Sequence, residues 1–118
     1  MSLMAARLTS AYNCAHFLCD AWEQETGESI RSLLDGFLAP RHLRKADSTL
    51  GHRMYRLTAP SDPCIVLWRR KGQAPHVGLY VRRAVLHLTD HGAMRQPLDL
   101  ASIGYFPPRF YAPRPHHS

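Results

Sequence analysis

Two β-rich runs in the second half of the chain constrain the fold more than any other feature. They cover Val77 to Val81 and Val85 to Thr89, and only residues 82–84 separate them. A connection of this length cannot hold a crossover, so the strands are predicted to form an antiparallel hairpin with a tight turn near Arg82 and Arg83. Residues at similar distances from the turn then become neighbours across the two strands.

The first half of the chain is predicted to be helical. From Asn13 onward, small and apolar residues recur at the spacing of an amphipathic helix, and Gly27 is a natural stop. This stripe consists of Cys14, Phe17, Leu18, Ala21 and Trp22. A second short helix is predicted over Ile30 to Leu38, because a similar stripe there ends before Pro40. Residues 41–52 are basic and polar and are interpreted as a loop.

Short β-rich runs punctuated by glycine and proline follow. Besides the hairpin, strands are predicted at Met54 to Leu57 and Cys64 to Arg69, with a weak one at Ile103 to Phe106 or at Arg109 to Tyr111. Helices first and strands later favour a single α+β domain over residues 1–118, with N-terminal helices packed on a small antiparallel sheet. The proline-rich tail from about residue 107 is expected to be extended and docked.

Composition argues against several classes of protein. No run of about 18 apolar residues occurs, so no membrane span is predicted, and the first residues lack the apolar segment of a secretory signal. The chain is therefore expected to be made in the cytoplasm. Three cysteines without regular spacing do not indicate a disulfide framework. The net charge of +6 favours anionic partners, but the basic residues are spread over loops and strand ends, which disfavours nucleic-acid binding.

Cys14 opens the strongest predicted helix, and His76 and His87 lie on the two strands of the hairpin. A helix N-terminus and a nearby imidazole both stabilise a thiolate, so they lower the pKa of a thiol. Because His76 and His87 lie at similar distances from the turn, they are predicted to bond to each other, one ring orienting the other. The pattern indicates a nucleophile, a base and an orienting residue. An activated Cys14 is expected to react faster near pH 6 than an ordinary thiol does.

The same residue types allow other interpretations. Taken alone, Cys14 is more often a small core residue, and the other two cysteines are interpreted as structural. Cys14, His16 and Cys19 could be zinc ligands, but on a helix their side chains point in different directions, and no metal is expected. His91 could replace His87 as the orienting residue, although it lies beyond the expected end of the strand.

The segments around these residues resemble the NlpC/P60 family of papain-like cysteine peptidases. YNCAHFLCDAW resembles the motif in which a cysteine opens a helix, HVGLYV resembles the strand that carries the base, and VLHLTDHGAMRQPL resembles the strand and turn that carry the third polar residue. SDPCIVLW resembles the strand before the base. The likeness covers Tyr12 to about Leu98. The chain departs from the family at Asn13, where Asp is frequent, and at Asp62-Pro63, where the family has Gly-Asp.

The resemblance implies a papain-like core and hydrolysis of an amide bond in a peptidoglycan peptide, commonly next to a D-glutamyl residue. Cys14 would attack, His76 would take and return the proton, and His87 would hold His76 in the right tautomer. The start of the helix at Asn13 would lie at the oxyanion and substrate, with Tyr12 as a second contact. The resemblance implies neither a metal nor a cofactor.

Compact members of this kind are familiar among proteins encoded with phage tail genes. The resemblance therefore also implies a place in a phage or phage-like tail, with the wall peptide and neighbouring tail or baseplate proteins as partners. The alternative is a structural or assembly protein of a tail tip or baseplate that keeps the same fold with weak or no activity. Such a protein would dock through its basic surface and its proline-rich tail.

Overall fold

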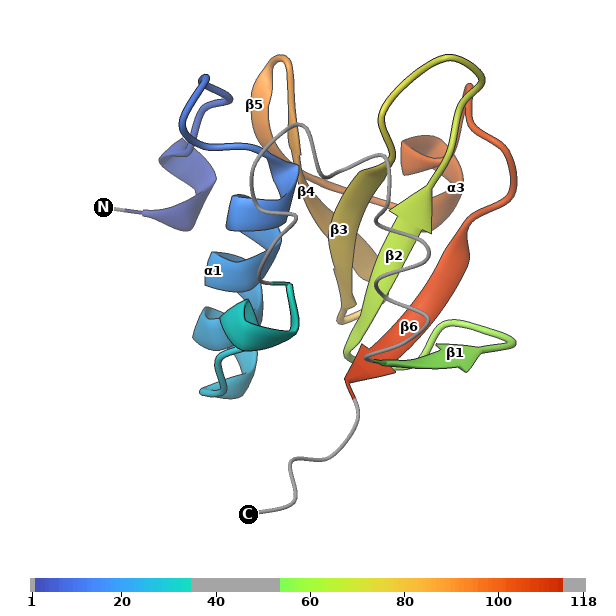
Figure 1. Ribbon diagram of the computed structural model, residues 1–118, viewed down its shortest axis with the longest axis horizontal. Coiled ribbons are helices and arrows are strands. Elements are labelled where there is room, and N and C mark those ends of the chain that lie inside the picture. Colours follow the sequence, from blue (N-terminus) through green and yellow to red (C-terminus); the bar gives the residue numbers. More distant parts are fainter. Residues whose placement is uncertain (1, 35–53, 114–118) are drawn as a thin grey trace.

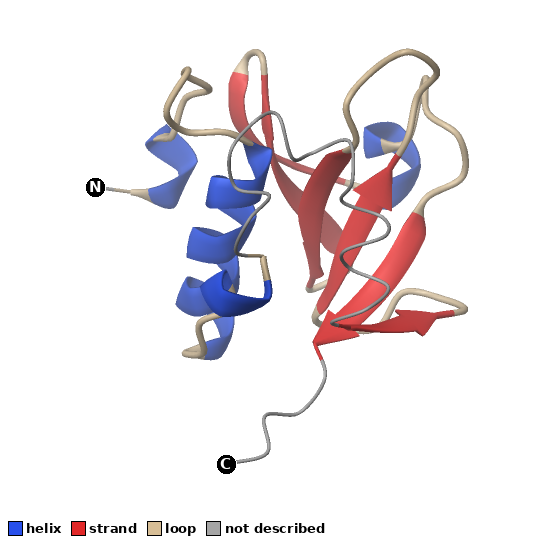
Figure 2. Cartoon of the chain, in the orientation of Figure 1, coloured by secondary structure: helices blue, strands red, loops and turns tan. Residues whose placement is uncertain are grey.

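The computed structural model describes residues 2–34 and 54–113. They form a small α+β domain, as predicted, in which a six-stranded antiparallel sheet has the order β1-β6-β2-β3-β4-β5. Helix α1 covers one face of the sheet, and the short helix α3 packs on the other (Figures 1 and 2). The helices are α1 (Cys14–Thr26) and α3 (Leu98–Ala101), with 3-10 turns η1 (Leu3–Ala5) and η2 (Arg31–Leu33). The strands are β1 (Met54–Leu57), β2 (Cys64–Trp68), β3 (His76–Val81), β4 (Ala84–Thr89), β5 (Gly92–Gln96) and β6 (Arg109–Pro113).

Helix α1 begins at Cys14 because the polar groups of its first turn are satisfied locally. The side chain of Asn13 accepts hydrogen bonds from the backbone N–H groups of Ala15, at 2.9 Å, and His16, at 3.2 Å. In return, Nδ1 of His16 accepts one from the backbone N–H of Asn13 at 3.1 Å, which completes a capping box. Gly27, with a φ of 77°, ends the helix in the left-handed conformation. The predicted start and stop of this helix are confirmed.

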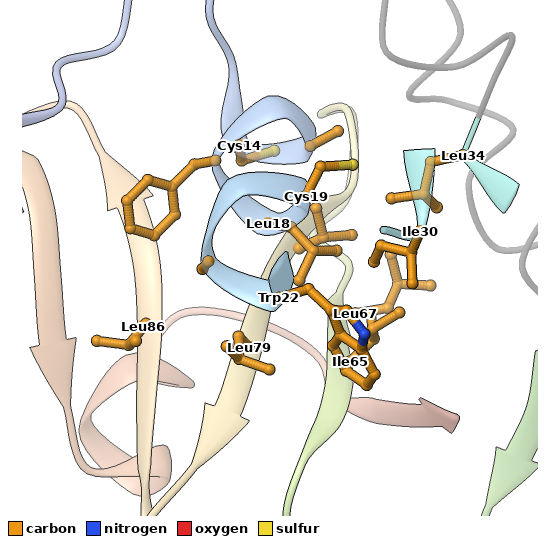
Figure 3. Close-up of a cluster of buried hydrophobic side chains, with 14 of the residues drawn as sticks. Cys14, Leu18, Cys19, Trp22, Ile30, Leu34, Ile65, Leu67, Leu79 and Leu86 are labelled. Carbon is orange, nitrogen blue, oxygen red and sulfur yellow. The ribbon is translucent and has the colours of Figure 1, made fainter. Parts of the chain in front are cut away.

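The main core lies between α1 and the sheet. Helix α1 packs on β3 and β4, and Leu18 and Trp22 point toward the strands in Figure 3. Side chains alternate along β3, so Val77 and Leu79 lie in this core while the side chain of His76 lies on the opposite face of the sheet. The largest fully buried apolar residues of this core include Phe17, Leu18, Leu34, Ile65, Leu67 and Leu79.

A smaller apolar cluster covers the opposite face of the sheet, around the fully buried Trp68 of β2. Its other buried members are Val66, Val85 and Ala101. The indole Nε1–H of Trp68 donates a hydrogen bond of 2.9 Å to Oγ of Ser102, and the Ser102 hydroxyl donates one of 2.7 Å to the carbonyl of Leu98. The first bond attaches the end of α3 to the sheet, and the second holds the Ser102 hydroxyl against α3 itself.

Most strands lie where the sequence predicts them, within one residue at each end. The weak strand is Arg109–Pro113 and not residues 103–106, and it pairs with both β1 and β2. The proline-rich tail is therefore extended and docked as far as Pro113. Strand β5 and helix α3 are missing from the prediction, which has only turns around Gly92 and Pro97.

The described part of the second predicted helix is a 3-10 turn and not an α-helix. In the described part, the chain makes only the 3-10 turn Arg31–Leu33, and the flanking Ile30 and Leu34 are 2% and 0% exposed. The rest of that helix and the predicted loop 41–52 lie outside the described residues. Across residues 2–34 and 54–113, no helix has the length and apolar character needed to cross a membrane.

Candidate functional site

The turn between β3 and β4 joins the two strands that carry the histidines. Arg82 and Arg83 have φ values of 49° and 64°, as in a two-residue hairpin turn of type I′. The backbone N–H of Arg82 donates a 2.8 Å hydrogen bond to Oδ2 of Asp62, and its guanidinium makes two bonds, of 2.5 and 2.9 Å, to the carboxylate of Glu25. The turn is thereby held to the loop before β2 and to the end of α1.

The register of this hairpin brings the two histidines together. Leu79 pairs with Leu86, so the ladder continues to place Gly78 opposite His87, and His76 lies one diagonal step away. Nε2 of His76 and Nδ1 of His87 are 2.8 Å apart and share a hydrogen bond. The predicted contact between the rings is therefore present, through a diagonal pair rather than a directly opposed one.

A third polar side chain continues this contact onto β5. Nε2 of His87 lies 2.6 Å from Oε1 of Gln96. In the β4–β5 ladder Val85 pairs with Gln96 and His87 with Met94, so this contact is diagonal as well. The sequence prediction misses Gln96 because it has no strand there. The available signal was the turn at residues 89–92, which follows a strand and contains a glycine.

Cys14 is the first residue of α1, at the end of the sheet where β3 starts (Figure 1). The residue is 8% exposed. Burial raises the pKa of its thiol, and hydrogen bonds from the backbone of Val77, of Cys14 itself and of Ala15 oppose this only in part. The thiol therefore lies beside the backbone of the residue that follows His76. The expectation of a lowered thiol pKa needs correction, because loss of solvent outweighs the donors at the helix start.

Burial also keeps both imidazoles of the pair neutral. Loss of solvent, helped by the neighbouring His87 and the charge of Arg70, lowers the pKa of His76 to about 3. The pKa of His87 is lowered by burial, and its hydrogen bond to Gln96 opposes this only partly. At neutral pH the site therefore holds a neutral thiol and two neutral rings. In that state one ring nitrogen of His76 is unprotonated and can accept a hydrogen bond.

Aromatic side chains hold the His76 ring from the side. His76 stacks on Trp68, its partner across the β2–β3 ladder, with ring centres 5.2 Å apart, and on Tyr105 with ring centres 6.1 Å apart. The guanidinium of Arg70 lies 4.9 Å from the centre of the Tyr105 ring and donates a 3.2 Å hydrogen bond to Gln73. The ring that would act as base therefore packs against the buried Trp68 and against Tyr105, and Tyr105 in turn contacts the positive charge of Arg70.

These side chains line one cleft of about 290 Å³. Its walls come from the start of α1, from β3 and β4, and from the segments that follow β2 and α3. The residues in its lining that bear on chemistry are Asn13, Cys14, Arg70, His76, His87, Asp90 and Tyr105. The three side chains predicted as nucleophile, base and orienting residue therefore share one cleft.

Other residues considered from the sequence lie elsewhere or have structural roles. Tyr12 does not line this cleft: its hydroxyl donates a 2.5 Å hydrogen bond to Asp20, and its ring lines a separate cavity of about 550 Å³ beside η1. This corrects its expected role as a second substrate contact. Asn13 does line the cleft, but its side-chain oxygen caps α1, and His16 completes that cap. His91 is exposed beyond the end of β4.

The remaining cysteines are buried thiols. Cys19 and Cys64 form no disulfide, and burial raises the pKa of Cys19 to about 11. Within residues 2–34 and 54–113, no three His, Cys, Asp or Glu side chains come together in a way that could hold a metal ion. The zinc interpretation of Cys14, His16 and Cys19 has no support in this geometry.

Comparison of the chain with known protein families, with curated proteins and with solved structures found no match.

Proposed function

We propose that this chain is a thiol hydrolase of the NlpC/P60 type, with a papain-like core, that cleaves an amide bond in peptidoglycan as part of a phage or phage-like tail. One observation carries the proposal: Cys14, at the capped start of a helix, shares a cleft with the hydrogen-bonded pair His76 and His87. Their order along the chain is that of the family which the sequence resembles. Each side chain comes from a different element, so the arrangement depends on the fold as a whole.

Proton transfer accompanies attack in the proposed reaction. Cys14 and His76 are both neutral at rest, so His76 takes the thiol proton as Sγ attacks the carbonyl carbon of the substrate. The C–S bond forms and the carbonyl oxygen becomes an oxyanion near the backbone N–H of Cys14. The proton then passes to the leaving amine as the C–N bond breaks. Water hydrolyses the thioester, again with His76 as base, and the thiol is restored.

Arg70 supplies a positive charge for the substrate. Its guanidinium is exposed, lies against Tyr105 and has no carboxylate partner within the described parts of the chain. A D-glutamyl residue linked through its side chain keeps a carboxylate beside the scissile amide, and a guanidinium binds such a group through paired N–H donors. On this proposal, Arg70→Gln raises KM for a substrate with a free carboxylate and has a smaller effect on one whose carboxylate is amidated.

The direct test is to incubate the purified protein with muropeptides and to identify the products by mass spectrometry. Wild type should release two peptide fragments, and Cys14→Ala should release none. Cys19→Ala is the matched control, because it makes the same change to a buried thiol on the same helix and should keep cleaving. Absence of cleavage by folded wild type, or cleavage by Cys14→Ala, contradicts the proposal.

An assembly role without catalysis is the second candidate, and exposed apolar side chains near the cleft favour it. Leu100, Ile103 and Phe106 are 51%, 70% and 54% exposed, and all lie between the start of α3 and β6. Exposed apolar groups of this size suit contact with a partner protein. On this alternative, Ile103→Ser with Phe106→Ser prevents incorporation into a tail particle, whereas Cys14→Ala has no effect.

A further inference from the structure

Three hydrogen-bonding side chains run across adjacent strands: His76 on β3 and His87 on β4, which line the cleft, and Gln96 on β5, which does not. We propose that Gln96 is a positioning residue whose amide orientation sets the tautomer of both histidines and leaves Nδ1 of His76 as the acceptor for the proton of Cys14. The catalytic consequence rests on the proposed function. The tautomer assignment does not depend on the proposed function, because it follows from the hydrogen bonds among these three side chains.

The direction of the hydrogen bonds follows from the atom that Gln96 presents. Each neutral imidazole has one protonated nitrogen that donates and one unprotonated nitrogen that accepts. Oε1 of Gln96 only accepts, so Nε2 of His87 carries the hydrogen. Nδ1 of His87 is then unprotonated and accepts from Nε2 of His76. The hydrogen of His76 is therefore on Nε2, and its lone pair is on Nδ1.

The opposite amide orientation reverses every bond in the chain. If the NH₂ group of Gln96 faced His87, Nε2 of His87 would accept and Nδ1 would donate to His76. Nδ1 of His76 would then hold the hydrogen and could not take the proton of a thiol. Because burial lowers the pKa of both histidines, the rings are neutral and the two directions are chemically different.

The rings themselves have little freedom to compensate. Trp68 packs against both of them, with ring centres 5.2 Å from that of His76 and 5.5 Å from that of His87. Neither ring can exchange the positions of its two nitrogens without turning against Trp68, whereas the Gln96 amide can exchange its donor and its acceptor by rotating, and each ring then changes tautomer in place. A glutamate at this position would present only acceptors, and a methionine would present neither a strong donor nor a strong acceptor.

The test is to measure the tautomers directly, by two-bond proton–nitrogen correlation NMR on protein labelled with ¹⁵N at histidine. Wild type should show the Nε2–H form for both His76 and His87, and Gln96→Glu should show the same. Gln96→Met should give a mixture of forms at His87. Gln24→Met, the same change at an exposed position of α1, should leave both rings unchanged. An Nδ1–H form of either ring in wild type, or no change in Gln96→Met, overturns the inference.

Muropeptide cleavage gives a second readout that separates this inference from the proposed function. Gln96→Met should lower kcat about tenfold, the effect of losing one hydrogen bond, with Gln96→Glu closer to wild type. If wild type has the expected tautomers and Gln96→Met mixes them, but no muropeptide is cleaved, the proposed function fails while the tautomer assignment is upheld. If wild type cleaves and Gln96→Met has unchanged kcat, the positioning role fails while the proposed function is upheld.

Discussion

Gly78 and His87 face each other across the β3–β4 ladder with no room for a side chain between them. A Cβ atom on Gly78 would lie 3.0 Å from Cβ of His87, 3.0 Å from the carbonyl oxygen of Leu86 and 3.1 Å from Cζ3 of Trp68. One of these contacts is with backbone, which cannot move aside at low cost. The absence of a side chain at Gly78 therefore creates the space in which His87 and Trp68 pack together.

Gly78→Ala should reduce the free energy of unfolding by about 1–3 kcal/mol, the usual cost of overfilling a packed site. It should also change the near-ultraviolet circular dichroism of Trp68, because the alanine methyl group presses on that ring. Gly72→Ala is the comparison: its φ of 75° is strained for alanine, but the added atom meets nothing within 4 Å. Both variants should lose stability, and only Gly78→Ala should alter the Trp68 signal. An unchanged signal in Gly78→Ala would contradict the packing described here.

The buried histidines should make the protein less stable in acid. The pKa of His76 is about 3 in the folded chain, against about 6.5 when unfolded, and the pKa of His87 is lowered too. Below about pH 6.5 these histidines bind protons in the unfolded chain but not in the folded chain, so the free energy of unfolding falls as the pH drops toward 3. A single histidine of this kind contributes a slope of at most about 1.4 kcal/mol per pH unit.

Urea denaturation at a series of pH values measures this slope. His76→Gln should flatten the slope between about pH 6 and pH 4, because it removes one of the groups responsible. His91→Gln replaces an exposed histidine and should leave the slope as it is in wild type. Equal slopes in wild type and His76→Gln would mean that His76 titrates normally in the folded chain.

Some elements could be predicted because several local signals agree on them. At α1 a cap at Asn13, an apolar stripe and a stop at Gly27 coincide, and all three are present in the structure. The short connection between β3 and β4 allows only a hairpin, so the contact between His76 and His87 could be predicted as well. Local spacing along the chain is sufficient to specify both features.

Other features depend on packing that local spacing does not contain. Residues 92–96 include no β-branched side chain, so strand propensity does not predict a strand there. They form a strand because they pair with β4, and Gln96 could therefore not be found from propensity. The pKa of Cys14 depends on a balance between burial and backbone donors, including the donor of Val77, which lies far from Cys14 in the sequence. The sequence shows the helix start but not how deeply the fold buries it.

The buried thiol should have an unusual pH profile for alkylation. Since burial raises the pKa of Cys14, its reaction with iodoacetamide should keep accelerating above about pH 9 and show no plateau below pH 7. The rate is followed by mass spectrometry of the labelled peptide, with Cys14→Ala to account for Cys19 and Cys64. A plateau below pH 7 would instead indicate a thiolate–imidazolium pair with His76, and the neutral resting state proposed here would be wrong.

Ser102 should matter for stability although it lies outside the cleft. Ser102→Ala removes the acceptor of the buried indole N–H of Trp68 and should reduce the free energy of unfolding by about 1–3 kcal/mol, because the donor is left without a partner. Ser61→Ala changes an exposed serine in the loop before β2 and should have little effect. Chemical denaturation followed by circular dichroism gives both values. Equal stability of the two variants would show that the bond to Ser102 contributes nothing.

The turn at Arg82 and Arg83 holds two non-glycine residues at positive φ, which costs about 1 kcal/mol or more at each. Arg83→Gly should therefore raise the free energy of unfolding, by up to about 1 kcal/mol, because glycine adopts this conformation without strain but loses more entropy on folding. Arg82→Gly should gain less, since it also loses the ion pair with Glu25.

Thermal and urea denaturation of the two variants measure the difference, and a destabilised Arg83→Gly would show that the turn is not strained. Muropeptide cleavage by the same variant checks that the substitution leaves the cleft unchanged. His76 is at the opposite end of β3 from this turn, so Arg83→Gly should cleave muropeptides at the wild-type rate if wild type cleaves them. A stabilised variant with altered kcat would mean that the register of the whole hairpin has shifted, because moving one strand by a residue changes which side chains meet across the ladder.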